Sequence, residues 1–407
     1  MLNNNNEREL AYVVSVTDVF PMDADRLERV MINGWAVVCA KGEFNKGDLG
    51  VFFEIDSMLP EIPPFSDIDF LRSKHYKIKS QKIRGVVSQG LLLPLSYFNF
   101  NHELKEGDFL TKELGVTYYI PEDNKRKSNP VIKDKYKRMA ASHANLFKLA
   151  PFRWLMKRQW GKDLLFVFFG HTKYNPLQFP TQFPYIHKTD EERIENIPWI
   201  LTEKDSNGNK SAWIKTTKVD GTSSTYILER KKFHKFEFYV TSRNVRQINE
   251  NQLNYHNTNS SSQTNVYWDM AEKYHIKEVL LDILEKEKDL DYVCLQGEIA
   301  GPNVQGNPHK LERVRFFAFN YIDSKRGRWN SVEAKNLFEK YDIEWVPIID
   351  TNYILPDDLE EFKLSADGVC EVDGSSGLRE GYVYRSIDGK RSFKNVSRKY
   401  LLKYQGD

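Results

Sequence analysis

The stretch Trp213–Leu228 constrains this chain more than any other, because it places a lysine between two strand-like runs. An apolar, β-branched run leads to Lys218, Val219, Asp220 and Gly221, and a second strand-like run follows the glycine. The glycine predicts a tight turn between two strands. The Lys218 amine is then presented at a strand end beside a carboxylate, where a lysine can act as a covalent nucleophile. The four residues alone are more typical of a surface hairpin. The later segments of the chain therefore have to distinguish a hairpin from a nucleophilic lysine.

Length and composition place the chain among globular proteins. It has 407 residues, enough for two or three domains, and 40% of them are hydrophobic and 29% charged. The longest apolar run, near Leu164–Phe169, falls far short of the roughly 20 residues of a membrane span. The first residues lack the basic and apolar regions of a signal peptide. We therefore expect a soluble protein with no membrane partner.

The three cysteines, Cys39, Cys294 and Cys370, are odd in number and far apart. This spacing indicates neither a disulfide framework nor a zinc site, so a reducing cytoplasm is the expected location. As small apolar residues, the cysteines are more typical of a protein core.

Residues 1–120 have the pattern of a β-rich module. Turn residues separate its strand-like runs at 9–19, 29–39 and 50–55. A basic, aromatic-bearing stretch, Lys74–Arg84, leads into a further apolar run. Short strands with a cationic face suggest an OB-like β-barrel, a common platform for single-stranded nucleic acid. Lys79, Lys82 and Arg84 are the candidate contacts to a nucleic-acid backbone, with an ordinary barrel surface as the alternative.

Basic residues concentrate between residues 124 and 162, although the net charge is only +2. The neutral total argues against a protein that is basic throughout. The stretch is turn-rich at first and compatible with a helix from about Val131 to Trp160. Residues 121–180 are therefore either a solvated, partly helical linker or a contact to phosphate groups that gains affinity by counterion release.

Residues 181–407 form the second predicted domain. Its strand-like segments lie at 213–214, 224–228, 236–241, 292–298, 314–322 and 381–385. Helices are expected at 190–197, 268–286, 331–341 and 357–364, and Ser331 is expected to cap the third. The pattern predicts an α+β fold with antiparallel sheets and flanking helices behind the OB-like barrel.

Five segments follow Lys218 in order, and each carries a residue type that chemistry could use. They are Ser242-Arg-Asn244, Gln296-Gly-Glu298, Phe316-Phe-Ala-Phe319, Glu380-Gly-Tyr-Val383 and Ser392-Phe-Lys394. Taken singly, a glutamate at a strand end is more often a surface carboxylate, and alternating phenylalanines are more often core. A lysine cluster near the end of the chain is more often a solvated face. The order of the whole series is the informative signal.

This series resembles the collinear motifs of covalent nucleotidyltransferases, the superfamily of ATP-dependent ligases and capping enzymes. Gly297–Asn307 is similar to the extended glutamate motif of RNA ligases, and Phe183–Arg193 to the leading segment of the RNA ligase 5 family. The module with Ala24–Leu27 and Lys82–Gly90 resembles the OB domain of that family. DNA ligases and capping enzymes usually carry an OB domain after the last lysine motif, whereas here the candidate module lies in front.

The resemblance implies an ATP-dependent RNA ligase that joins 3′-OH and 5′-phosphate ends. Lys218 would attack the α-phosphorus of ATP and carry AMP, which moves to a 5′-phosphate before a 3′-OH seals the strand. The expected substrates are nicks with RNA on the 3′-OH side, so the partners would be RNA or RNA/DNA hybrid ends. The protein is expected to act as a monomer.

The resemblance also assigns roles to particular residues. Asp220, Glu298 and Glu380 would surround a Mg²⁺ or Mn²⁺ ion, since carboxylates are the hard oxygen donors that such cations prefer. Lys394 would contact the α-phosphate, and Arg243 the ribose or the incoming phosphate. Phe319 would stack on the adenine, and the backbone of Thr216 and Thr217 would contact the edge of the base. Gly221 of the lysine motif is also expected at the nucleotide.

Two positions depart from the family pattern. Many relatives carry a lysine where this chain has Ser392, and some carry an aspartate where it has Asn320. Lys390 or Arg391 could supply the missing charge. The alternatives within the superfamily are a DNA ligase or a GTP-dependent capping enzyme. The alternative outside it is a non-catalytic nucleic-acid-binding protein.

Overall fold

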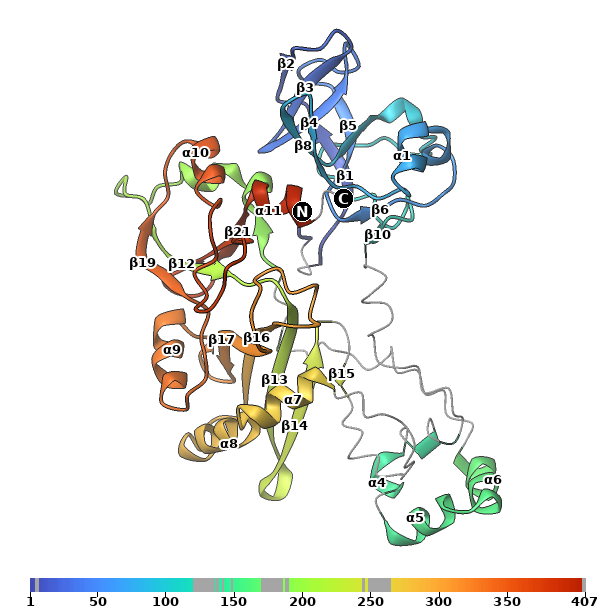
Figure 1. Cartoon of the computed structure of the whole chain (residues 1–407), viewed down its shortest axis with the longest axis vertical. Coiled ribbons are helices and arrows are strands. Elements are labelled where there is room, and N and C mark those ends of the chain that lie inside the picture. Colours follow the sequence, from blue (N-terminus) through green and yellow to red (C-terminus); the bar gives the residue numbers. More distant parts are fainter. Residues whose placement is uncertain are drawn as a thin grey trace.

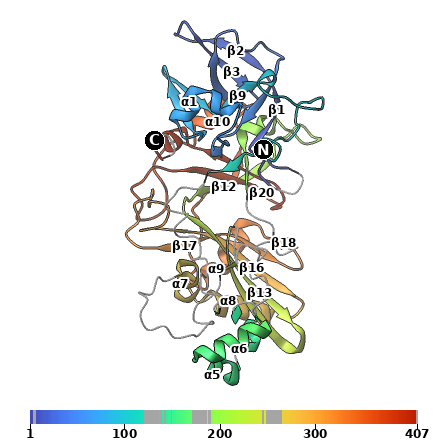
Figure 2. The same cartoon turned by 90° about the vertical axis from the view of Figure 1, so that its right-hand side faces the viewer.

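The structure is a computed structural model that describes residues 1–3, 7–119, 136, 139–140, 143–147, 149–169, 186, 190–243, 246–247 and 265–404. Figure 1 shows the amino-terminal strands, in blue, as an upper body, and the carboxy-terminal half as a larger body beside and below it. Figure 2 shows helices from the middle of the chain at the opposite end from the amino-terminal strands.

The upper body consists of short strands. They are β1 (Ala11–Ser15), β2 (Asp18–Pro21), β3 (Leu27–Ile32), β4 (Trp35–Ala40), β5 (Leu49–Phe53), β6 (Ser57–Met58), β7 (Ser80–Ile83), β8 (Val86–Gln89), β9 (Leu91–Pro94) and β10 (Thr117–Tyr118), with η1 (Phe65–Asp67), α1 (Asp69–Ser73) and η2 (Leu95–Tyr97). The sheets are ordered β1-β5-β9, β2-β3-β4, β10-β6 and β7-β8. Phe52 and Phe53 belong to two different apolar clusters. Because successive side chains of a strand point to opposite faces, β5 is buried on both sides.

The larger body contains two sheets. The first has the order β11 (Glu192–Arg193), β21 (Ser392–Val396), β20 (Gly381–Ser386), β12 (Ala212–Lys218) and β19 (Ile348–Ile354). The second has the order β15 (Arg246–Gln247), β14 (Lys235–Ser242), β13 (Thr222–Lys231), β16 (Tyr292–Ala300), β17 (Arg315–Asp323) and β18 (Gly327–Arg328). Since β12 and β13 belong to different sheets, the segment Val219–Gly221 is where the chain crosses from one to the other.

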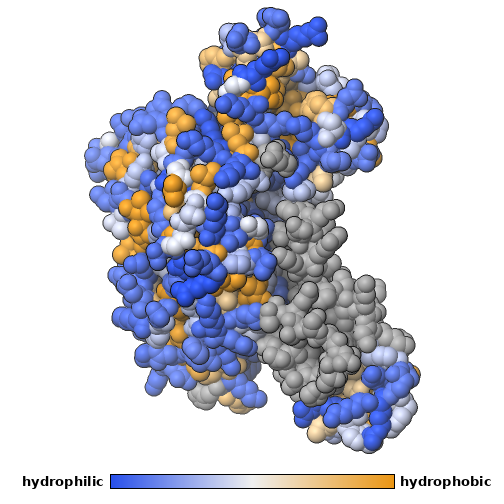
Figure 3. Space-filling view, viewed as in Figure 1, coloured by the Kyte–Doolittle hydropathy of each residue, from blue (hydrophilic) through white to orange (hydrophobic). Residues whose placement is uncertain are grey.

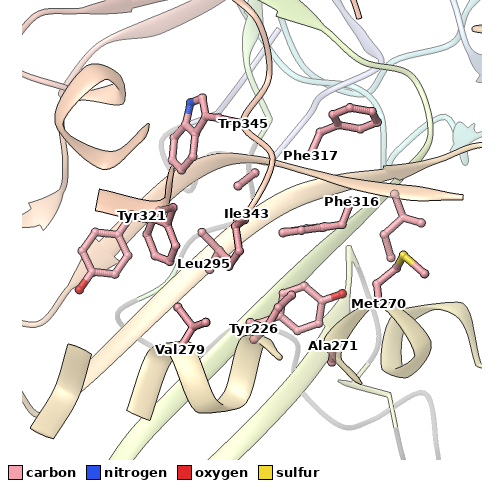
Figure 4. Packing of buried hydrophobic residues seen from close by; sticks show 14 of the residues in the cluster. Tyr226, Met270, Ala271, Val279, Leu295, Phe316, Phe317, Tyr321, Ile343 and Trp345 are labelled. Atoms are coloured by element: carbon pink, nitrogen blue, oxygen red, sulfur yellow. The ribbon is translucent and has the colours of Figure 1, made fainter. Parts of the chain in front are cut away.

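Helices cover the six-stranded sheet. Those of the larger body are α7 (Val266–Lys273), α8 (Ile276–Lys286), α9 (Ser331–Glu339), α10 (Leu359–Leu364) and α11 (Arg398–Tyr404), with η4 (Ile194–Asn196), η5 (Pro198–Leu201) and η6 (Lys232–His234). Figure 4 shows Tyr226 and Phe316 on the side of the sheet that faces α7, with Met270 and Ala271 against them. Phe317 lies on the opposite side of β17 (Figure 4). Both phenylalanines are buried members of the same apolar cluster, so the core packs against both faces of β17 at this point.

The middle of the chain carries α4 (Ala144–Phe147), α5 (Ala150–Met156) and α6 (Gln159–Phe169). Phe147, Met156 and Leu165 form a small apolar cluster of their own. Helices α4 and α5 lie within the helix expected from about Val131 to Trp160, and α6 extends past it to Phe169. The basic residues 124–135 lie outside the described residues. The division of the chain at residues 120 and 180 remains a prediction.

No helix among the described residues is long and apolar enough to cross a membrane. The face seen in Figure 3 is predominantly hydrophilic, and its hydrophobic residues lie in small scattered groups.

The helix expected at 190–197 is not formed. Glu192 and Arg193 form β11 and pair in parallel with Phe393 and Lys394 of β21, and the 3-10 helix η4 follows. Pairing with a strand from the far end of the chain outweighs the local helix pattern, which is a weak preference.

Two other helix expectations need correction in detail. The helix expected at 268–286 is two helices, α7 and α8, which meet at His275 with a left-handed φ of 49°. Asn330, not Ser331, caps α9, because its side chain accepts from the backbone of Val332 and Glu333.

Buried polar side chains join the two bodies. Asn196 of η4 accepts from the Tyr12 hydroxyl at 3.1 Å and from the Trp35 indole at 2.6 Å, and it donates to Glu54 at 2.8 Å. Glu54 is fully buried and also forms an ion pair with Arg8 at 2.8 Å. We call this set of five residues the seam network. It holds the amino-terminal strands against the sheet that carries Lys218.

Candidate active site

Lys218 lies at the end of β12, where strand register brings a glutamate to it. Lys218 is opposite Gly381, the first residue of β20, so Glu380 directly precedes its partner. The distance between Lys218 Nζ and Glu380 Oε1 is 2.7 Å. Two residues predicted from separate motifs are therefore in contact.

Glu298 reaches the lysine from the second sheet. β13 begins directly after Gly221 and pairs with β16, where Ser223 is opposite Glu298. A Cβ atom on Gly221 would lie 2.1 Å from the carbonyl oxygen of Ile299. A glycine is thus needed for the chain to cross between the sheets so close to β16.

We expect Gly221→Ala to destabilise the protein, because the added methyl group must push Ile299 and β16 away. Overpacking of this kind costs about 1–3 kcal/mol, which urea denaturation measures as a lower free energy of unfolding. Ser223→Ala is the matched control, since it lies two residues further along, on β13, and adds no atoms. Equal stability of Gly221→Ala and the unmodified protein would contradict the close approach.

The charges around Lys218 determine its protonation. Burial alone would lower the pKa of the Lys218 ammonium, but Glu380, Asp220 and Glu298 raise it above its ordinary value. Burial, with Glu380 next, raises the pKa of Asp220 to about 7. Burial also raises the pKa of Glu298 to about 8, with Asp220 and Glu380 contributing. Without a ligand the site therefore stabilises an ammonium and holds more negative charge than this one cation offsets.

Two residues that sequence reasoning missed hold Asp220 in place. The backbone N–H of Asp220 donates to His309 Nε2 at 2.7 Å, and the Tyr400 hydroxyl donates to its carboxylate. His309 is fully buried, and burial lowers its pKa, so the neutral ring accepts this bond. His309 lies two residues beyond the Gly297–Asn307 motif, which was the available signal. Tyr400 follows the last lysine motif on α11, and its role could not be read from spacing.

Lys394 lies in a second charge cluster beside the first. Its Nζ is 3.5 Å from Asp190 Oδ1, and Arg243 donates to Asp190 Oδ2 at 2.5 Å. Burial lowers the pKa of Lys394 to about 8, although Asp190 opposes that effect. The structure thus brings Lys394 and Arg243 together through a shared carboxylate. Asp190 was not singled out, but it lies in the Phe183–Arg193 segment that carries the family resemblance.

Thr216 and Thr217 are buried in β12. The Thr216 hydroxyl donates to the Val383 carbonyl at 3.2 Å, and the Thr217 hydroxyl donates to Glu371 at 3.0 Å. The backbone N–H of Thr217 donates to the Pro347 carbonyl at 2.9 Å. Both hydroxyls and this N–H are therefore engaged within the protein, and the role of the pair at a base edge remains a prediction.

Phe319 is half-buried at an irregularity of β17. Gln296 is opposite Asn320 and Gly297 is opposite Ala318, so Phe319 is the extra residue of a β-bulge. The Arg385 guanidinium lies 5.8 Å from the centre of its ring and donates to Thr216 Oγ1 at 3.3 Å. Phe319 and Thr216 therefore both contact Arg385, which is another residue that the sequence did not indicate.

The carboxylates fit a hydrated cation better than a directly bound one. No three His, Cys, Asp or Glu side chains in the described ranges come close enough to hold an ion by themselves. Glu380 Oε2 is nevertheless buried and receives no hydrogen bond from the part of the chain that is described. This orphaned oxygen and the raised pKa values of Asp220 and Glu298 leave a place for a cation that reaches the acids through water.

The three candidate nucleic-acid contacts lie on the upper body. Lys79 is half-buried just before β7, Lys82 is exposed on β7, and Arg84 is exposed in the β7–β8 turn with φ 47°. β7 lies next to α11, which carries Tyr400. Their role in binding remains a prediction.

The crossing of the chain between two largely antiparallel sheets at a lysine, with acids supplied by neighbouring strands, defines a covalent nucleotidyltransferase domain behind a small β-barrel. Comparisons with known proteins narrow this class. Residues 211–404 match the model of the RNA ligase family, and residues 10–95 match a model of an OB-fold domain. The chain therefore carries an RNA ligase domain with an OB-fold domain in front of it.

Solved structures cover almost the whole chain. The Naegleria gruberi RNA ligase with pyrophosphate is 26% identical, covers 98% of this chain and 100% of its own, and has a TM-score of 0.71. A mutant of that ligase with ATP and manganese gives 26% identity, coverage of 98% and 99%, and a TM-score of 0.70. A further mutant with AMP and manganese has the same identity, coverage of 98% and 100%, and a TM-score of 0.68. No curated protein matches the sequence significantly.

Proposed function

We propose that this protein is an ATP-dependent RNA ligase that joins 3′-OH and 5′-phosphate ends through AMP bound covalently to Lys218. The observation that carries the proposal is the 2.7 Å contact between Lys218 and Glu380, inside a domain that matches the RNA ligase family. Structures of the similar Naegleria ligase hold ATP, AMP, pyrophosphate and manganese, which supports ATP and Mg²⁺ or Mn²⁺ as the cofactors.

The reaction consists of three transfers at phosphorus. The neutral Lys218 amine attacks the α-phosphorus of ATP, the bond to pyrophosphate breaks, and the nitrogen loses a proton as lysyl-AMP forms. An oxygen of the RNA 5′-phosphate then attacks the AMP phosphorus and breaks the bond to nitrogen. Finally the 3′-OH attacks the 5′-phosphate, AMP leaves, and the phosphodiester is closed.

The surrounding side chains have distinct tasks in these transfers. Asp220, Glu298 and Glu380 would hold a hydrated Mg²⁺ or Mn²⁺, whose charge favours the neutral amine and offsets charge on the phosphate. Lys394 would contact the α-phosphate, where a cation stabilises the charge that develops during transfer. Arg243, on the other side of Asp190, would bind the ribose or the incoming phosphate. Adenine would stack on Phe319, and the edge of the base would contact the backbone of Thr216 and Thr217. Gly221 would let the nucleotide approach the backbone closely.

Spacing in the Naegleria ligase supports the choice of residues. Its solved variants include a lysine and an aspartate two positions apart, and a glutamate and a lysine fourteen positions apart, each replaced by alanine. The same spacings separate Lys218 from Asp220 and Glu380 from Lys394. Residue pairs chosen for study there therefore correspond in spacing and type to those proposed here.

The partners would be RNA or RNA/DNA hybrid ends, and the best substrate a nick with RNA on the 3′-OH side. The OB-fold domain, with Lys79, Lys82 and Arg84, would bind that strand. The three cysteines are free and buried, which is consistent with a reducing cytoplasm. We infer that the protein acts there as a monomer.

Incubation with labelled ATP and Mg²⁺, followed by a denaturing gel, tests the proposal. We expect a covalent adduct that is labile to acid, and sealing of a nicked duplex when the 3′-OH strand is RNA. Labelled GTP and an all-DNA nick are the controls. An adduct formed only with GTP would support a capping enzyme, equal sealing of DNA would support a DNA ligase, and no adduct would support a binding protein.

A further inference from the structure

An exposed tyrosine of the OB-fold domain lies at the charge cluster of the active site. Tyr118 ends β10 and keeps 45% of its surface exposed. The Arg243 guanidinium lies 6.0 Å from the centre of its ring. Arg243 is joined through Asp190 to Lys394, as described above. An open aromatic ring is thus linked by three successive contacts, through Arg243 and Asp190, to the lysine proposed to bind the α-phosphate.

The ring lies in a strongly charged environment. Asp56 and burial raise the pKa of Tyr118 to about 12, and Arg8, Arg243 and Arg193 act in the opposite direction. All four charged groups are therefore close to the phenol. Each arginine is itself paired with a carboxylate: Arg8 with Glu54, Arg193 with Asp56, and Arg243 with Asp190. Arg243 is the most exposed of the three, with 43% of its side chain accessible, so it is the one that an incoming phosphate group could reach.

The neighbouring residue differs from Tyr118. Tyr119 is half-buried, and Lys77 Nζ lies 3.2 Å from the centre of its ring. Lys77 is brought there by a bridge to Met58 of β6, the strand that pairs with β10. Tyr119 is therefore already covered by a cation, whereas Tyr118 offers an exposed ring. Figure 1 shows β6 and β10 at the lower edge of the OB-fold domain, toward the ligase domain.

We propose that Tyr118 is the stacking platform for the base of the 5′-phosphorylated terminal nucleotide of the RNA, with Arg243 beside that nucleotide's phosphate. This inference rests on the proposed function. A ligase must hold the terminal nucleotide while its phosphate attacks lysyl-AMP. Aromatic side chains bind bases of any sequence by stacking. Because the ring belongs to the OB-fold domain, the two domains would share the binding of a single nucleotide.

Separate measurement of the partial reactions tests the platform. For Tyr118→Ala we expect an unchanged rate of adduct formation with ATP alone, and a rise of about tenfold in the KM of AMP transfer to 5′-phosphorylated RNA. Tyr118→Phe keeps the ring and should behave like the unmodified protein. Tyr97→Ala is the matched control, since Tyr97 is equally exposed at 45% on the same domain.

Other results would overturn the assignment. An unchanged KM for 5′-phosphorylated RNA in Tyr118→Ala would remove the platform, as would an equal rise in Tyr97→Ala. An effect confined to the concentration of the 3′-OH strand in sealing a pre-adenylated end would place that strand on the ring instead. Loss of adduct formation in Tyr118→Ala would show that the residue serves ATP or the fold. Absence of an adduct in the unmodified protein is a different failure, because it would contradict the proposed function itself.

Discussion

Lys218→Ala is expected to abolish the covalent adduct and the sealing of RNA ends that carry a plain 5′-phosphate. The methyl side chain offers no nitrogen to attack the α-phosphorus, so no lysyl-AMP can form. In the structure the lysine is also the counter-ion of Glu380, and its removal leaves three buried acids without that cation. A gel with labelled ATP measures the adduct, and a nicked duplex measures sealing.

Sealing of a pre-adenylated RNA end should persist in Lys218→Ala, because the last transfer does not use the lysine as a nucleophile. Lys215→Ala is the matched control. Lys215 lies three residues earlier on β12 and therefore on the opposite face, where its Nζ is 4.0 Å from the centre of the Tyr382 ring. We expect Lys215→Ala to form the adduct. Adduct formation by Lys218→Ala would show that the nucleophile has been assigned to the wrong residue.

The rate of adduct formation should rise steeply with pH. The ammonium of Lys218 has a raised pKa, so the neutral amine is a small fraction at pH 6 to 8 and grows about tenfold for each pH unit. Asp220 and Glu298, with pKa values of about 7 and about 8, gain negative charge over the same range and then attract a cation. Both effects increase the rate of adduct formation as the pH rises. Between pH 6 and pH 8 we expect an increase of about 100-fold or more at fixed Mg²⁺.

A measurement without ATP tests the ionisation of the acids independently of the ionisation of the Lys218 amine. If the acids hold the cation, Mg²⁺ should raise the melting temperature of the protein more at pH 8 than at pH 6, since only ionised carboxylates bind it. Glu298→Gln should reduce this shift at pH 8, because the amide cannot ionise. A flat rate between pH 6 and pH 8, or a Mg²⁺ shift that is equal at both pH values, would contradict the assignment of these ionisations.

The sequence predicted the residues whose position follows from strand order. Lys218 ends β12, Glu380 directly precedes β20, and Glu298 lies two residues before the end of β16, so antiparallel pairing of these strands brings the three segments together. Asp190 and His309 could not be predicted in the same way. Each is placed by a contact between distant segments, Asp190 with Lys394 and His309 with the backbone of Asp220. Such contacts leave no period or spacing in the sequence.

The same reason explains the errors in secondary structure. The segment at 190–197 has a helical pattern, but β21 offers it a free edge and the OB-fold domain offers partners for Asn196. The proposed role of Tyr118 could not be predicted from the sequence either, because it depends on a contact with Arg243 of another domain.

The seam network limits how the enzyme can admit a substrate. A hinge requires a surface that separates at little cost in free energy. Pulling Asn196 away from the amino-terminal strands would leave its buried amide and the buried Trp35 indole without these hydrogen bonds, at a cost of about 1–3 kcal/mol for each group. The barrel and the catalytic sheets should consequently travel as one rigid unit. A nicked substrate would then have to bind to both bodies in the arrangement that they already have, without closure of a hinge between them.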